Sequence, residues 1–133
     1  MAEAKTKPTD QSVEDFLNAI PDEKKRKDSI AIVEMMRRVS GSQPVMWGDA
    51  IVGFGLQQIV YAGGKTGDWP KIGFSPRKQN LTLYGMGGLS RHPGLAARLG
   101  KYKTGNTCLY INKLADVDFG VLEEVTGLVF RGE

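Results

Sequence analysis

Five short segments rich in β-branched and aromatic residues follow one another from residue 45 onward, and their spacing constrains the fold more than any other feature of the sequence. The connections between the first four are short, with Gly-Gly-Lys-Thr-Gly-Asp and Ser-Pro-Arg-Lys between the later ones, whereas a parallel crossover needs about a dozen residues or more. The spacing therefore predicts antiparallel hairpins. The segments are residues 45–55, 57–62, 70–76, 80–86 and 107–111.

Helical patterns precede these segments. Ser12 is expected to cap a first helix, which Pro21 ends. A second helix is expected over about residues 22–40, and Gly41 is suited to stop it in a left-handed conformation. Glu34 is expected to pair with Arg38 on the outer side of this helix. Its predicted buried stripe is Ile30, Val33, Met36 and Val39.

The complete order of elements predicts an α+β fold. A short helix is expected near residues 93–100, and Asp116 is expected to cap a last helix. We predict a mainly antiparallel sheet of about five short strands, with the N-terminal helix pair and the C-terminal helix packed on one face. A flexible tail (1–11) is expected before a single domain (12–133), a length sufficient for one hydrophobic core.

Cysteine use and hydropathy predict a cytoplasmic protein with no membrane partner. Cys108 is the only cysteine, which excludes an intramolecular disulfide framework and favours a reducing compartment. No apolar run approaches the roughly 20 residues that span a bilayer, and the polar N-terminus lacks a signal-peptide pattern. His92 is the only histidine, so neither a Cys-His pair nor a zinc ligand set is expected. We therefore predict no metal, no cofactor and no catalytic residues.

Basic residues are concentrated in the middle of the chain. Residues 35–104 contain 10 Lys or Arg and 2 Asp or Glu, whereas acidic residues outnumber basic ones on either side. An anionic ligand at the centre would explain this pattern, and so would acidic helices whose charges pair across a basic sheet. The sequence leaves both explanations open. Nucleic acid is disfavoured because no basic helix, zinc finger or RNP-like motif accompanies the charge.

Two glycine-rich loops invite comparison with phosphate-binding motifs. Gly64-Lys65-Thr66 lacks the glycine that a P-loop requires five residues earlier, since position 59 is Ile, and a turn follows where a helix is required. Residues 85–92 lie between a predicted strand and a predicted helix, where backbone N–H groups can surround an anion and Arg91 and His92 can add charge. Turn geometry is the plainer explanation of the three glycines in this loop.

The candidate ligand site combines aromatic walls with basic loops. Trp47 and Trp69 each stand beside a glycine and an acid at a strand end, as a small pocket requires, although core packing is the plainer role for both. Two basic pairs would add positive charge if their loops converge. The candidate ligand-binding residues are Trp47, Asp49, Asp68, Trp69, Arg77, Lys78, Lys101 and Lys103.

Three blocks, in order along the chain, carry a resemblance to a known family. The first is Met46-Trp47-Gly48 with residues 51–55, the second is 67–70 with 73–78 and 81–84, and the third is 99–105 with 108–111, ending near Asp116-Val117-Asp118. Together they resemble the YdhG-like family of small bacterial cytoplasmic proteins. The resemblance implies a compact α+β fold. One branch of that family is described as frataxin-like, which implies a role in iron delivery.

The leading interpretation is a non-enzymatic binding module for a small anionic ligand or an acidic partner segment. A frataxin-like iron chaperone is the first alternative, but the acids of the first helices alternate with the basic run at 24–27, which opposes a dense cation site. An enzyme of unrecognised type is the second alternative. It would need Asp49 or Asp68 as a buried general base with a raised pKa.

Overall fold

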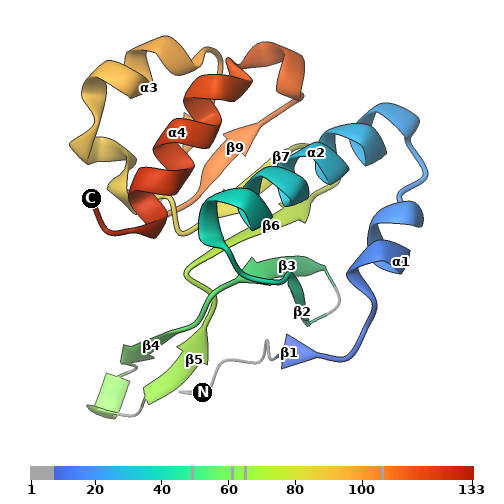
Figure 1. Cartoon of the computed structure of the whole chain (residues 1–133), viewed down its shortest axis with the longest axis vertical. Coiled ribbons are helices and arrows are strands. Elements are labelled where there is room, and N and C mark those ends of the chain that lie inside the picture. Colours follow the sequence, from blue (N-terminus) through green and yellow to red (C-terminus); the bar gives the residue numbers. More distant parts are fainter. Residues whose placement is uncertain (1–7, 49, 61, 65, 106) are drawn as a thin grey trace.

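An antiparallel sheet of seven strands forms the centre of the described part of the chain (Figure 1). The structure is a computed structural model that describes residues 8–133 except 49, 61, 65 and 106. The strand order is β1-β2-β3-β6-β7-β9-β8, and every neighbouring pair is antiparallel, as the short connections predicted. The strands are β1 (Pro8–Thr9), β2 (Val45–Trp47), β3 (Ile51–Phe54), β6 (Ile72–Pro76), β7 (Leu81–Tyr84), β8 (Lys103–Thr104) and β9 (Leu109–Ile111).

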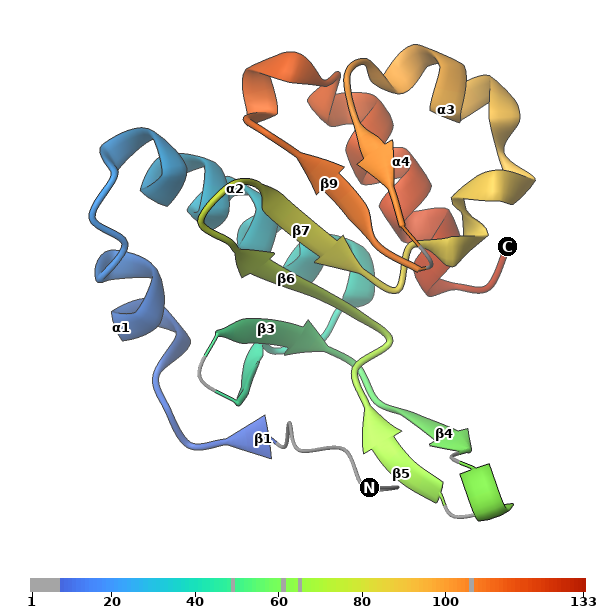
Figure 2. The ribbon, with the colours of Figure 1, turned by 180° about the vertical axis from the view of Figure 1, so that it is seen from behind.

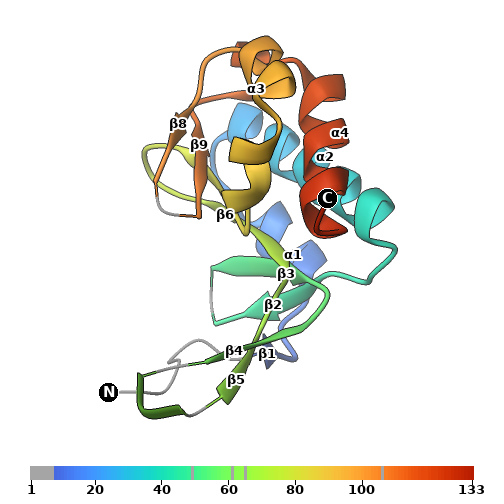
Figure 3. The same ribbon diagram turned by 90° about the vertical axis from the view of Figure 1, so that its left-hand side faces the viewer.

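Two further strands, β4 (Gln57–Val60) and β5 (Thr66–Trp69), pair with each other and form an arm. They are inserted between β3 and β6, and a short 3-10 helix, η1 (Ala62–Gly64), lies between them. Figures 1 and 3 show this β4–β5 arm projecting away from the helices. At its base, Lys71 N donates a hydrogen bond to Phe54 O at 3.2 Å, so the arm continues directly from the β3–β6 pair.

The main sheet has seven strands where about five were predicted, because several of its strands are too short to leave a sequence pattern. Residues 45–55 form two strands, since the chain turns back at Gly48, where φ is +66°. β1 and β8 contain two residues each and lie at the two edges of the sheet. β1 belongs to the stretch that was predicted to be a tail. Of the strand predicted at 57–62, residues 57–60 form β4 in the arm, and residue 61 lies outside the described residues.

Four α-helices and two more 3-10 helices complete the described chain, and α3 confirms the short helix predicted near residues 93–100. Ser12 caps α1 and Gly41 ends α2, both as predicted. Asp118 caps α4 because its Oδ1 accepts from Val121 N at 3.1 Å, so the assignment of this cap to Asp116 is wrong. The helices are α1 (Val13–Asn18), α2 (Glu23–Ser40), η2 (Gly87–Arg91), α3 (Pro93–Leu99), η3 (Leu114–Asp116) and α4 (Phe119–Phe130).

α2 and α4 lie side by side on one face of the sheet, and the hydrophobic core fills the space beneath them (Figures 1 and 3). α2 packs on β3 and β6 and also against α4, so its buried face is wider than a single stripe. Ile30 is 38% exposed, and its predicted place in the buried stripe is therefore wrong. The buried residues of α2 are Ser29, Ile32, Val33, Met35 and Met36.

The charge pairing on α2 also differs from the prediction. Arg38 pairs with Glu123 of α4 at 3.0 Å, and Glu34 pairs with Arg37 at 2.8 Å. The predicted Glu34–Arg38 pair does not form, because the packing of α4 against α2 offers Arg38 a partner that spacing along one helix cannot reveal.

Candidate functional site

The two tryptophans meet on the face of the sheet opposite α2 and α4, the face that Figure 2 shows in front of the helices. Trp47 ends β2 and Trp69 ends β5, and their ring centroids are 5.8 Å apart. Trp47 is 2% exposed because it lies over Gly53 of β3. The burial predicted for Trp47 is confirmed, and Trp69 is half-buried beside it. The pair joins the β4–β5 arm to the sheet.

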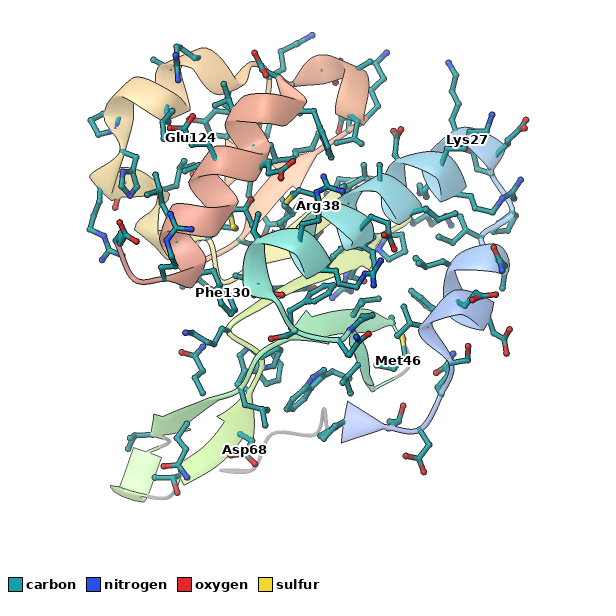
Figure 4. All side chains as sticks on the ribbon, viewed as in Figure 1. Lys27, Arg38, Met46, Asp68, Glu124 and Phe130 are labelled. Carbon is teal, nitrogen blue, oxygen red and sulfur yellow. The ribbon has the colours of Figure 1, made fainter. Side chains whose placement is uncertain are left out.

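Asp68, one of the two candidate acids, is exposed on β5 in the arm (Figure 4). An exposed carboxylate lacks the desolvation that tunes a general base, so Asp68 does not meet the requirement set for it. The other candidate, Asp49, lies outside the described residues.

The loops that carry the predicted basic pairs meet at a hollow of about 540 Å³, at the end of β6 remote from the arm. Lys101 and Lys103 line it directly. The turn between β6 and β7 carries Arg77 and Lys78 and lines the hollow with its next two residues, so the two loops converge. We call this site the polar hollow, and its lining residues are Gln79, Asn80, Gly100, Lys101, Tyr102, Lys103, Tyr110, Asn112 and Asp116.

Backbone contacts hold the walls of the polar hollow in place. Lys101 N donates to Asp116 O at 2.9 Å, which ties the α3–β8 connection to η3. Gly100 has φ +118°, and a Cβ atom there would lie 2.4 Å from Asp116 O, so this approach requires glycine. On the other wall, Lys25 Nζ donates to two carbonyl oxygens of the β6–β7 turn, at 2.7 and 3.2 Å. α2 and η3 therefore fix the two loops that border the site.

Uncharged hydrogen-bonding groups complete the lining. Asn80 Oδ1 already accepts from Thr82 Oγ1 at 2.6 Å, which leaves the amide NH2 of Asn80 as a donor. Tyr110 of β9 is the cross-strand partner of Lys103 of β8, so the two residues are neighbours on adjacent strands. The pKa of Tyr110 lies above its ordinary value, chiefly because of the charge of the neighbouring Cys108. The phenol is therefore a neutral hydrogen-bond donor at neutral pH.

Arg77 lies beside the polar hollow and reaches across the sheet. Its Nη2 donates to the Tyr84 hydroxyl at 2.5 Å, and this hydrogen bond is the main cause of a raised Arg77 pKa. Smaller charge effects of Cys108 and Tyr110 raise it further, so the guanidinium charge acts on a residue that lines the hollow. Lys78 is exposed at the tip of the same turn.

The acidic helices do not neutralise these cations in the part of the chain that the structure describes. None of the ion pairs found there includes Arg77, Lys78, Lys101 or Lys103. Arg37, Arg38 and Arg98 of the basic middle segment do pair with acids of the flanking segments, so pairing explains part of the charge pattern and leaves out the four loop cations. The ion pairs are Lys27–Glu23, Arg37–Glu34, Arg38–Glu123, Arg98–Glu124 and Arg131–Glu133.

Of the candidate residues that the structure describes, only Lys101 and Lys103 line the polar hollow, and the sequence did not indicate its uncharged part. The described candidates that do not line it are Trp47, Asp68, Trp69, Arg77 and Lys78. Tyr110 could have been found, because it alternates with the buried Leu109 and Ile111 and must therefore point away from the core. The amide side chains that line the hollow show no comparable alternation with buried residues. They lie in connections, and only the order β6-β7-β9 brings those connections together.

No group of three or more His, Cys, Asp or Glu side chains among the described residues is placed to hold a metal ion. Within the same residues, every helix is too short or too polar to cross a membrane. Comparison of the chain with known protein families, curated proteins and solved structures finds no match. The resemblance to the YdhG-like family therefore stays a prediction.

Proposed function

We propose that this protein is a cytoplasmic, non-enzymatic module that binds a small anionic ligand in the polar hollow. The convergence of Lys101 and Lys103 with the basic β6–β7 turn carries the proposal, because no ion pair within the described residues neutralises these cations. The hollow, at about 540 Å³, lies within the roughly 300–1,000 Å³ of small-molecule sites. This size favours a small ligand over an acidic segment of a partner protein.

The lining suggests a ligand that is negative at one end and hydroxylated at the other. The ammonium groups of Lys101 and Lys103 attract the anionic group and donate hydrogen bonds to it. The amides and phenols of the lining orient the ligand through further hydrogen bonds. The carboxylate of Asp116 repels a ligand that is negative throughout and accepts a hydrogen bond from a hydroxyl or amino group. A small hydroxylated carboxylate or phosphate combines these properties.

The two alternatives gain no support from the described residues. A frataxin-like iron chaperone needs carboxylates that are free to bind iron, whereas Asp22 and Asp28 accept backbone hydrogen bonds and Glu23 pairs with Lys27. The enzyme alternative needs a buried carboxylate as its general base, whereas Asp68 is exposed.

Thermal melting in the presence of small anions tests the proposal. We expect the Tm to rise with phosphate, sulfate or a hydroxylated carboxylate such as citrate, since a ligand at 100 times its Kd stabilises the fold by about 2.7 kcal/mol. The rise with citrate, a probe that contains no phosphate, should disappear in the Lys101→Gln/Lys103→Gln variant, which removes both lining cations.

The matched control is Lys24→Gln/Lys27→Gln, which changes the net charge equally at two exposed positions of α2 outside the polar hollow. This control should keep the full rise in Tm. Chloride at the same ionic strength separates binding from general screening. Equal rises with citrate in the wild type and in Lys101→Gln/Lys103→Gln would contradict the proposal.

A further inference from the structure

A second hollow, of about 350 Å³, lies at the base of the β4–β5 arm, where the arm meets η2 and the end of α4. We call it the basic hollow. Among its lining residues are three cations from three different elements, namely Lys71, Arg91 and Arg131, together with Gly88, Thr107 and Phe130. It shares no lining residue with the polar hollow. The loop at 85–92 singled out by the sequence forms one of its walls.

Positive charge in the basic hollow has no opposing carboxylate among the described lining residues. Arg91 is exposed and takes part in none of the ion pairs found in the described chain. Arg131 pairs with Glu133 at 2.6 Å, but both side chains are more than half exposed, and such a pair is weak enough for an anion to compete. Lys71 and Arg91 are therefore the principal cations, and Arg131 is the third.

Packing fixes where the two principal cations stand. Lys71 Nζ lies 4.4 Å from the centre of the Phe130 ring, which holds the ammonium group at the end of α4. Figure 4 shows Phe130 at that end, next to the strands that lead into the arm. A Cβ atom at Gly88 would come within 2.9 Å of Arg91 Nη2 and 3.2 Å of Val129 Cγ2. The guanidinium of Arg91 thus occupies space that any larger residue at position 88 would fill.

We propose that the basic hollow binds the phosphate group of a small phosphate monoester. A phosphate dianion matches the two or three positive charges that converge here, and a guanidinium presents a planar fork of donors suited to two phosphate oxygens. Val129 and Phe130 form an apolar side of the hollow, against which the carbon atoms of the ester can lie. This site is separate from the polar hollow and does not rest on the function proposed for it.

Residue-resolved NMR titration tests the proposal on the full chain. Glycerol 3-phosphate and inorganic phosphate serve as probes, with sodium chloride holding the ionic strength constant. We expect saturable shifts of the Gly88 and Thr107 amide resonances, which report on the basic hollow. Arg91→Gln should weaken binding roughly tenfold or more, because it removes a charged hydrogen-bond donor. Saturation by glycerol 3-phosphate alone would also support the proposal, since the apolar wall then contributes.

Three variants separate a binding role from a structural one. Arg98→Gln removes an exposed arginine of α3 that does not line the basic hollow, so it should leave the affinity unchanged. Lys71→Arg keeps the charge over the Phe130 ring and should keep binding within a few-fold, whereas Lys71→Gln should lose it. Absence of saturable shifts at Gly88 and Thr107, or equal affinities in the wild type and Arg91→Gln, would overturn the proposal.

One variant distinguishes an error in the phosphate-site proposal from an error in the function proposed for the polar hollow. Lys101→Gln/Lys103→Gln should abolish the rise in Tm with citrate and leave the phosphate-dependent shifts at Gly88 and Thr107 intact. Loss of those shifts in this variant would place the phosphate in the polar hollow and overturn the inference.

Discussion

Gly53 of β3 lies directly beneath the indole ring of Trp47 on the neighbouring strand. A Cβ atom at position 53 would come within 2.5 Å of Trp47 Cδ1 and 2.7 Å of Pro70 Cβ. Because Gly53 has no side chain, the indole of Trp47 can lie against the backbone of β3. Trp47 is therefore only 2% exposed, although α2 and α4 do not cover this face of the sheet. At the scale of single residues, a missing side chain determines how the aromatic pair is packed.

Gly53→Ala should destabilise the fold by about 1–3 kcal/mol, because the added methyl group displaces the indole and Pro70. Chemical denaturation measures the loss, and a red shift of tryptophan fluorescence reports exposure of Trp47. Gly94→Ala in α3 is the control, since a Cβ atom there meets nothing within 4 Å and alanine favours a helix. Unchanged stability in Gly53→Ala would mean that the indole does not rest on this glycine.

At the scale of elements, the β4–β5 arm depends on few contacts outside itself. An isolated pair of strands is marginally stable in water. The arm exposes Leu56 and Val60, which are 63% and 73% accessible. Contacts between the arm and the rest of the protein are concentrated at its base, where Trp69 meets Trp47 and the two strands continue toward β3 and β6. The arm should therefore open independently of the core.

Hydrogen exchange should show this difference directly. We expect the amides of β4 and β5 to exchange at least about 100-fold faster than those of β6 and β7, because the arm can open without exposing the core. Trp69→Ala should accelerate exchange in the arm further and leave β6 and β7 protected. Uniform protection across the arm and the sheet would show instead that the two open together.

At the scale of the whole molecule, the charged side chains fall into two groups, those on the faces of the helices and those that border the two hollows. Those of the helices are largely paired with one another, within α2 or between α2, α3 and α4. The cations that border the polar hollow and the basic hollow lie in strand connections, in β8, in η2 and at the end of α4, and of these only Arg131 takes part in an ion pair within the described chain. This division makes the two hollows, and not the paired faces of α2 and α4, the place where an anion would bind.

The same division predicts the behaviour of the protein toward iron. We expect anaerobic calorimetric titration with ferrous iron to give no saturable, stoichiometric binding, because the acids at the start of α2 are held by hydrogen bonds and by Lys27. Apparent binding should also not change in Asp15→Asn, which removes an exposed acid of α1. A saturable site in the low micromolar range would support the iron-delivery alternative instead.

Properties that depend on neighbouring residues could be predicted from the sequence alone. The α+β class, the antiparallel pairing, the cap at Ser12 and the end of α2 at Gly41 follow from periodicity, short connections and side-chain chemistry within a few residues. The site prediction required the two basic loops to meet, and both loops border the polar hollow, but only Lys101 and Lys103 of the four cations line it.

Tertiary structure decided everything that depends on which distant segments meet. The exposure of Ile30 and the pairing of Arg38 with Glu123 follow from the position of α4 against α2. β9 pairs with β7 although α3 separates them in the chain, and this pairing places Tyr110 beside the β6–β7 turn. Such contacts arise from burial of a shared core, a property of the whole chain that no local pattern contains.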